Sequence, residues 1–115
     1  ILLSMKRDRV RFKFIQRMSQ ILEEKYRPER IVLFGSFAKG RITRDSDVDL
    51  LIVKRTSLPF YQRLVEVRRL VSSARRGIPF DPIVVTPEEL SCRIKVGDRF
   101  LEDILQSGQV LYAKS

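Results

Sequence analysis

Residues 35–53 read GSFAKGRITRDSDVDLLIV, a glycine-serine turn followed after ten residues by an Asp-x-Asp pair and an apolar run. The run predicts a strand over 47–53 that is buried on both faces beyond the aspartates. Side chains alternate along a strand, so Asp47 and Asp49 should project together, roughly 6–7 Å apart. At that separation the two carboxylates repel by about 2–3 kcal/mol. A divalent cation with oxygen ligands, Mg²⁺ or Mn²⁺, would remove this penalty.

The glycine-serine turn follows a short apolar run at 31–34. Gly35 has no Cβ, so the backbone can approach a ligand closely. Ser36 would offer a hydroxyl and backbone N–H groups to phosphate oxygens. Each motif alone is more typical of an ordinary strand edge or a strand-to-helix turn. Together they form the arrangement that metal-assisted phosphoryl or nucleotidyl transfer requires.

The flanking patterns predict an α+β fold, a small mixed sheet with helices packed on it. Helices are expected over 4–26 and 58–76, with apolar faces that include Val10 and Tyr61 respectively. Thr86-Pro-Glu-Glu89 has the residues of a capping box that begins a third helix. A fourth helix is expected at 100–105, and strands over 31–34, 47–53, 78–85 and 109–112. We expect a single domain over 1–115, with 1–4 as an upstream extension before a methionine.

The composition limits the chemistry. The chain has no histidine and one cysteine, which excludes histidine-dependent nucleophilic catalysis and a Cys/His zinc site. Residues 1–81 carry 19 Lys and Arg against 9 Asp and Glu, a balance that attracts nucleic acid, nucleoside triphosphates or an acidic protein. The apolar runs are too short to span a membrane, so a cytoplasmic protein without a membrane partner is expected.

The turn, the spacing and the carboxylate pair resemble the signature of the DNA polymerase beta-like nucleotidyltransferase superfamily. The segment 35–53, together with FDPIVVTPEEL at 80–90 and DILQSGQVLY at 103–112, resembles its minimal nucleotidyltransferase branch. Members of that branch are small cytoplasmic proteins often paired with a HEPN-domain partner. Within this resemblance, Lys39 stands where arginine is common, and Pro82 suggests that the third strand is an edge or is distorted.

The resemblance implies a two-metal site. A third carboxylate is expected on a neighbouring strand, and Asp81 matches it. The implied catalytic and metal-binding residues, for Mg²⁺ or alternatively Mn²⁺, are Asp47, Asp49 and Asp81. The implied nucleotide-binding residues are Gly35, Ser36, Lys39 and Arg44, and Arg44 lies on the loop from which it could reach a triphosphate.

The activity implied by the resemblance is transfer of AMP from ATP, or of another nucleotide, to a tyrosine hydroxyl of a HEPN-domain toxin. The chain would then be an antitoxin, assembled as a hetero-oligomer or homo-oligomer. An alternative is a binding module of the same fold that neutralises its partner without turnover. A third hypothesis, a basic nucleic-acid-binding protein, leaves the spacing of the turn and the aspartates unexplained, so nucleic acid is not expected as the primary partner.

Overall fold

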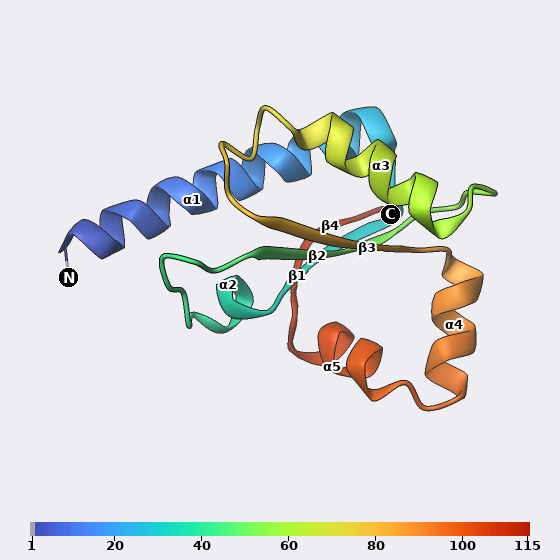
Figure 1. The fold of residues 1–115 in the computed structure, drawn as a ribbon. Helices are drawn as coiled ribbons and strands as arrows, with labels where there is room; N and C mark the ends of the chain where they lie inside the picture. Colours follow the sequence, from blue (N-terminus) through green and yellow to red (C-terminus); the bar gives the residue numbers. More distant parts are fainter. Residues whose placement is uncertain (1) are drawn as a thin grey trace.

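The computed structural model describes residues 2–115 and confirms the expected fold class, a mixed four-stranded sheet with helices on both faces (Figure 1). The first half of the chain forms α1 (Leu2–Ile21), the π-helical turn η1 (Leu22–Tyr26), β1 (Arg30–Phe34), α2 (Ser36–Lys39) and β2 (Val48–Val53). The second half forms α3 (Phe60–Val71), β3 (Phe80–Val85), α4 (Pro87–Lys95), α5 (Arg99–Ser107) and β4 (Gln109–Ala113). Within residues 2–115 no helix has both the length and the apolar content needed to cross a bilayer.

The sheet has the strand order β3-β2-β1-β4. β1 runs antiparallel to β2 and β4, whereas β2 and β3 are parallel. The four consecutive buried residues 50–53 explain why β2 lies inside the sheet, since both faces of the strand are covered. Pro82 lies in β3, an edge strand, which is where a sheet tolerates a proline.

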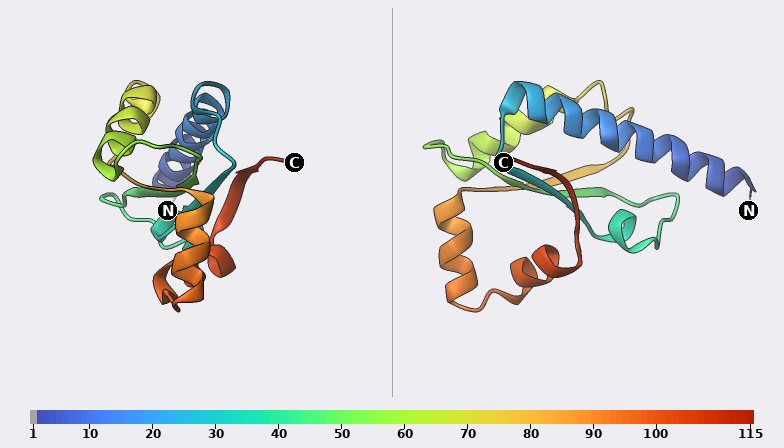
Figure 2. Two further views of the ribbon diagram at one scale, coloured as in Figure 1. Left: turned by 90° about the vertical axis from the view of Figure 1, so that its right-hand side faces the viewer. Right: turned by 180° about the vertical axis from the view of Figure 1, so that it is seen from behind.

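Two cores pack on opposite faces of the sheet. Val48, Leu50 and Ile52 of β2 point to the face covered by α1 and α3. The alternate residues Leu51 and Val53 point to the face covered by α4 and α5. The two helical layers lie on either side of the sheet in both views of Figure 2.

The first half of α1 projects beyond the sheet, which makes the molecule 44 Å long in one direction and under 30 Å in the others (Figure 1). Val10 is therefore 46% exposed, and the expectation that it belongs to the buried stripe is wrong. Ile15 and Met18, further along the same predicted apolar stripe, are buried as expected. The expectation for Tyr61 is also wrong, because this side chain lies on the side of α3 opposite the buried Arg63 and is 75% exposed.

Some helices and strands are shorter than predicted. The helix expected over 58–76 is regular only from Phe60 to Val71, and turns follow it as far as Gly77. The strand expected over 78–85 begins at Phe80. The capping box of Thr86 and Glu89 at the start of α4 is confirmed, with both reciprocal hydrogen bonds present.

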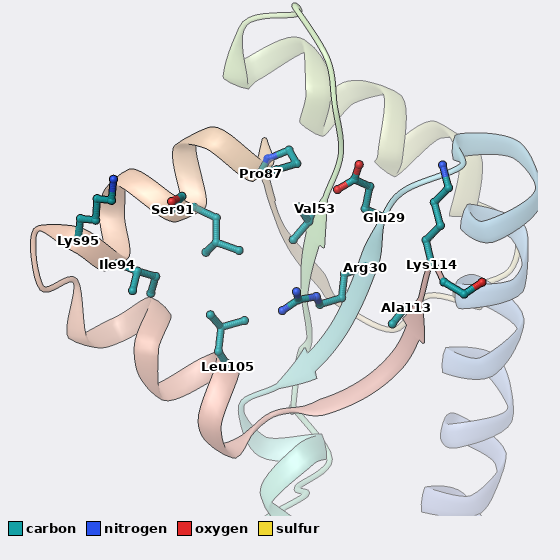
Figure 3. Close-up of a pocket in the computed structure, with 12 residues that line it drawn as sticks. Glu29, Arg30, Val53, Pro87, Ser91, Ile94, Lys95, Leu105, Ala113 and Lys114 are labelled. Carbon is teal, nitrogen blue, oxygen red and sulfur yellow. The ribbon is translucent and has the colours of Figure 1, made fainter.

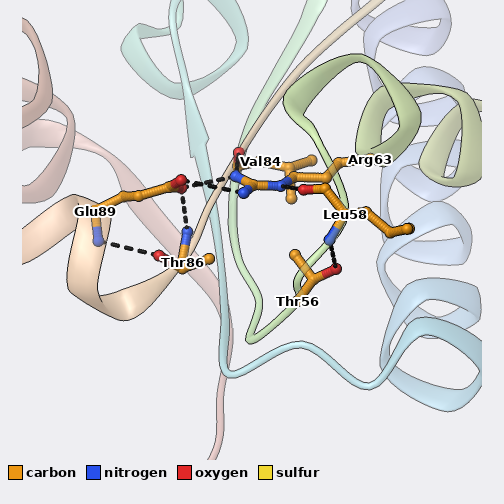
Figure 4. A network of polar contacts seen from close by, with 6 residues as sticks. All are labelled: Thr56, Leu58, Arg63, Val84, Thr86 and Glu89. Carbon is orange, nitrogen blue, oxygen red and sulfur yellow. Dashed lines mark hydrogen bonds and ion pairs between the residues drawn. The ribbon is translucent and has the colours of Figure 1, made fainter.

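A buried arginine joins α3, β3 and α4 (Figure 4). The Arg63 guanidinium donates to both Glu89 carboxylate oxygens, at 2.7 and 3.1 Å, and to the Val84 carbonyl oxygen at 3.2 Å. Its Nε donates to the Leu58 carbonyl oxygen at 2.8 Å. The paired guanidinium lowers the pKa of Glu89 to about 2. This network fixes the strand that carries Asp81 against two helices.

Candidate active site

Two of the three predicted carboxylates lie side by side in the sheet. Asp49 of β2 and Asp81 of β3 are direct partners in the parallel register, and adjacent strands are about 4.8 Å apart. Alternation places both side chains on the α4–α5 face, because Leu51 and Ile83, two residues further along each strand, belong to that core. Sequence positions 32 residues apart are thereby brought into one cluster.

Asp47 lies immediately before β2 and not within it, so the predicted strand starts one residue too early. Its side chain is exposed, whereas Asp49 is half-buried. Within residues 2–115, none of the carboxylates of Asp47, Asp49 and Asp81 forms an ion pair with a Lys or Arg side chain under 4 Å. The negative charge of the cluster is therefore not balanced by neighbouring cations of the chain.

This crowding changes the acidity of Asp49. Partial burial, followed by the charges of Asp81 and Asp47, raises the pKa of the Asp49 carboxyl from 3.8 to about 6. Burial in a low-dielectric site and nearby like charges both disfavour the ionised form. A cation at this position would reverse both effects, so the electrostatics favour a bound positive charge.

The glycine-serine turn lies against Asp49. Phe34, the last residue of β1, is the antiparallel partner of Asp49, so the chain enters the turn beside this carboxylate. Gly35 has φ +72° and ψ −151°, a conformation that L-residues rarely adopt. A Cβ on Gly35 would also collide with the Asp49 carboxylate. Both constraints require glycine here and keep the backbone within reach of a ligand bound to Asp49.

The remaining predicted nucleotide-binding residues surround this turn. Ser36 is the first residue of the short helix α2, and Lys39 is its exposed last residue. A cavity of about 190 Å³ between α2 and α5 is lined by Gly35, Lys39 and the aromatic side chains of Phe34 and Phe100. The turn thus opens on one side to the carboxylates and on another to an aromatic-walled pocket.

Arg44 lies on the exposed loop between α2 and β2, and a buried arginine that the sequence analysis missed holds this loop. Arg11 of α1, 8% exposed, donates to the Thr43 carbonyl oxygen at 2.9 Å and to that of Arg44 at 3.3 Å. Its guanidinium also pairs with Asp8 at 2.8 Å and lies 5.1 Å from the Phe37 ring centroid. One side chain therefore contacts both α2 and the loop that leads to the aspartates.

A signal for this role exists in the sequence. Arg11 is four residues before Ile15 and seven before Met18, so it lies in register with the buried stripe of α1. A cation at such a position must find oxygen acceptors inside the fold. Ser46 closes the same loop, since its hydroxyl accepts a hydrogen bond from the Thr43 N–H at 2.8 Å.

The residues fit a hard divalent cation by their chemistry, because carboxylate oxygens are the ligands that Mg²⁺ and Mn²⁺ prefer. In the described part of the chain no three Asp, Glu, Cys or His side chains are already gathered as a metal site. The raised pKa of Asp49 and the exposed, unpaired carboxylate of Asp47 agree with a donor set that a cation would draw together.

Comparisons with known proteins agree with this geometry. The sequence profile described as "Nucleotidyltransferase domain" matches residues 15–111. A protein of Methanocaldococcus jannaschii, named "Putative protein adenylyltransferase", is 34% identical over 102 residues, which cover 87% of this chain and 96% of the relative.

Two solved structures share the fold. One, described as a toxin-antitoxin with AMP-PNP, superposes with a TM-score of 0.63 at 20% identity and covers 87% of this chain and 74% of that chain. The other, from Sulfolobus solfataricus and described as a "putative nucleotidyltransferase", has a TM-score of 0.54 at 23% identity and covers 76% of this chain and 78% of that chain.

Proposed function

The chain belongs to the nucleotidyltransferase domain family, and from this premise we propose that it transfers AMP from ATP to a tyrosine hydroxyl of a HEPN-domain toxin. In this role it would act in the cytoplasm as an antitoxin. The observation that carries the proposal is the pairing of Asp49 with Asp81 beside Gly35 at the open end of one sheet face. The name of the M. jannaschii relative supports adenylyl transfer to a protein, and the toxin-antitoxin likeness in fold agrees with a protein partner.

The proposed ligands of two Mg²⁺ ions are the carboxylates of Asp47, Asp49 and Asp81. When bound, the metal ions would neutralise the triphosphate and lower the pKa of the acceptor hydroxyl. Asp49 is the most buried of the three, so it would fix the position of the cluster, while the exposed Asp47 adjusts to the ligand. Mn²⁺ offers the same oxygen chemistry.

The nucleotide would lie along the glycine-serine turn. The backbone at Gly35 can approach the phosphates because it has no Cβ, and the Ser36 hydroxyl donates to a phosphate oxygen. Lys39 and Arg44, both exposed at the rim, balance the remaining negative charge. The acceptor hydroxyl gives its proton to the Asp81 carboxylate and its oxygen bonds to the α-phosphorus. The bond from the α-phosphorus to the bridging oxygen of the β-phosphate breaks, and pyrophosphate leaves.

Arg11 is a positioning residue in this scheme, not a catalytic one. Its hydrogen bonds to the loop carbonyls hold the segment that carries Arg44 and ends at Asp47. Its contact with Phe37 holds α2, the helix that follows Gly35. The relative position of the phosphate turn and the carboxylates therefore depends on α1.

The test is a labelling assay with the purified chain, Mg²⁺, α-labelled ATP, GTP, CTP or UTP, and the HEPN-domain protein encoded beside its gene. We expect label on the partner from ATP, and no label with the Asp47→Asn, Asp49→Asn double variant. Glu24→Gln, which neutralises an exposed carboxylate on η1 away from the glycine-serine turn, is the matched control and should label normally.

Two other results would contradict the proposal. Undiminished label from the double variant would show that the aspartates are not the reacting site. A stable complex with no label from any nucleotide would favour the alternative, a module of the same fold that neutralises its partner by binding alone. Loss of label from partner variants with single Tyr→Phe changes would identify the acceptor hydroxyl.

A further inference from the structure

A groove of about 700 Å³ separates α4 and α5 from the end of the sheet, away from the carboxylates (Figure 3). Val53, the last residue of β2, lies at its floor, and Leu90, Ile94 and Leu105 line its helical side. The volume is within the range of sites that bind ligands in proteins, roughly 300–1,000 Å³. The groove therefore combines a volume sufficient for a ligand with an apolar strip formed by these four side chains.

Unpaired cations surround this lining. Arg30, Lys95 and Lys114 are exposed, and within residues 2–115 none of their side chains forms a hydrogen bond or an ion pair. Glu29 is the one acidic residue among the described lining residues, and Arg55 already binds its carboxylate at 2.8 Å. The charge of the groove is therefore positive and available to a ligand from outside.

We propose that this groove, called here the α4–α5 groove, docks an acidic segment of a protein partner. An apolar side chain of the segment would lie on the lining formed by Val53, Ile94 and Leu105, while its carboxylates pair with the cations at the rim. A nucleic acid would match the rim but would leave the apolar lining without a partner, so a peptide fits the whole groove better.

The neighbouring sheet edge agrees with an extended segment. β4 pairs only with β1 and is an edge of the sheet, and Ala113, near its end, lines the groove. Edge strands can accept an additional strand from another chain. A segment in the groove would therefore have backbone groups as well as side chains to bind.

The groove and the carboxylates share a face but not residues. Val53 and Asp49 lie four residues apart on β2 and point to the same side, which corresponds to roughly 13 Å along the strand. A partner held at Val53 would be on the face where the acceptor hydroxyl is needed without covering Asp49. The inference rests on the proposed function only in taking this partner to be the protein that receives the nucleotide.

The test compares two double charge reversals of the full chain. Arg30→Glu with Lys95→Glu changes the groove, and Lys13→Glu with Arg17→Glu makes the same charge change on the exposed side of α1. Affinity for the purified HEPN-domain protein encoded beside the gene is measured by titration calorimetry in 150 mM salt. We expect the groove variant to bind at least tenfold more weakly and the α1 variant to bind within about twofold of the wild-type chain.

A second variant fills the groove without changing its charge. Ser91 is exposed and lines the groove, so Ser91→Trp should also weaken binding at least tenfold. Thermal unfolding of each variant verifies that it is folded. A groove variant that binds as tightly as the wild-type chain would overturn the proposal, and so would weaker binding of the α1 variant alone.

The remaining outcomes separate this proposal from the proposed function. A wild-type complex without label transfer, still weakened by the groove changes, would refute the transfer reaction and support the groove. Label transfer that is undiminished in the groove variants, together with unchanged affinity for the partner, would support the transfer reaction and refute the groove proposal. Failure of the wild-type chain to form a complex with the partner would overturn the groove proposal. Displacement of the partner by a 20-nucleotide RNA that the groove variant no longer binds would also overturn it, because the groove would then be a nucleic-acid site.

Discussion

Replacing Asp49 by asparagine should stabilise the fold at neutral pH while it abolishes nucleotidyl transfer. In the absence of a divalent cation, Asp49 is ionised above pH 6 beside Asp81 and Asp47, in a half-buried position. Asparagine has nearly the same shape and no charge. The substitution therefore removes the repulsion and the cost of burying a charge, with little change in packing.

The magnitude follows from the pKa of Asp49, which is about 6 in the folded chain against a reference value of 3.8. A carboxyl with a raised native pKa binds its proton more tightly when folded, so between pH 4 and pH 6 the free energy of unfolding falls as the pH rises. A shift of about two pKa units corresponds to about 3 kcal/mol, which the partial exposure of Asp49 reduces to about 2 kcal/mol. This penalty is complete above pH 6 and absent below pH 4.

The assay is chemical unfolding of the wild-type chain, Asp49→Asn and the exposed control Glu24→Gln, at pH 4 and at pH 7.5 with EDTA. We expect Asp49→Asn to exceed the wild-type chain by about 2 kcal/mol at pH 7.5, about 8 °C in Tm, and to equal it at pH 4. Added Mg²⁺ should stabilise the wild-type chain more than the variant. The reasoning would be refuted if the difference in free energy of unfolding between Asp49→Asn and the wild-type chain were no larger at pH 7.5 than at pH 4.

Three further predictions test the supporting geometry. Gly35→Ala should destabilise the fold by about 2 kcal/mol in urea unfolding and prevent transfer, because its Cβ meets the Asp49 carboxylate and its φ is positive; unchanged stability would contradict this. Arg63→Met should lower the free energy of unfolding by about 3 kcal/mol, because it leaves the Glu89 carboxylate without its buried partner. Arg55→Met should cost under about 1 kcal/mol, because the ion pairs of Arg55 are exposed. Equal losses of stability in the two variants would contradict this. Arg11→Met should lower kcat for transfer at least tenfold with little change in the KM for the partner, because the loop that ends at Asp47 loses its anchor. Arg11→Lys should recover part of this loss. A change in Tm without a change in kcat would show that Arg11 is only structural.

The central features of the fold were predictable because they depend on local pattern. The unbroken apolar run before Val53 predicts an inner strand, and the structure has β2 there. The capping box at Thr86 predicts the start of α4 with its residues and its hydrogen bonds. Pro82 indicates either an edge strand or a distorted one, and β3 is an edge strand.

The long helix was predictable only in part. Its periodicity does not reveal that the first half extends past the sheet, so Val10 has the spacing of a core residue and no core to enter. Tyr61 is exposed for a different reason, because it lies about 120° around α3 from the middle of the buried stripe of Arg63, Val67 and Val71. Burial depends on where an element is placed against its neighbours, and this information is not local.

In the candidate site, too, local features were predictable from the sequence and long-range ones were not. The spacing of Asp47 and Asp49 predicts that they lie close together, although Asp47 lies just before β2 and not in it. The register of Asp49 with Asp81 depends on two strands that are distant in sequence. Arg11 was not among the predicted site residues: its register with the buried stripe of α1 indicates burial, but its acceptors are carbonyl oxygens of a loop more than 30 residues away. The α4–α5 groove likewise brings together β1, β2, α4, α5 and the C-terminal residues.

The most direct test of the account is whether the three carboxylates form one metal site. Mn²⁺ binding, followed by the loss of the free-ion EPR signal, is measured for the wild-type chain and for Asp47→Asn, Asp49→Asn, Asp81→Asn and the control Glu24→Gln, each with a non-hydrolysable ATP analogue. We predict that each of the first three substitutions weakens Mn²⁺ binding at least tenfold and that the control leaves it unchanged. Equal Mn²⁺ affinity in all five proteins would contradict the account.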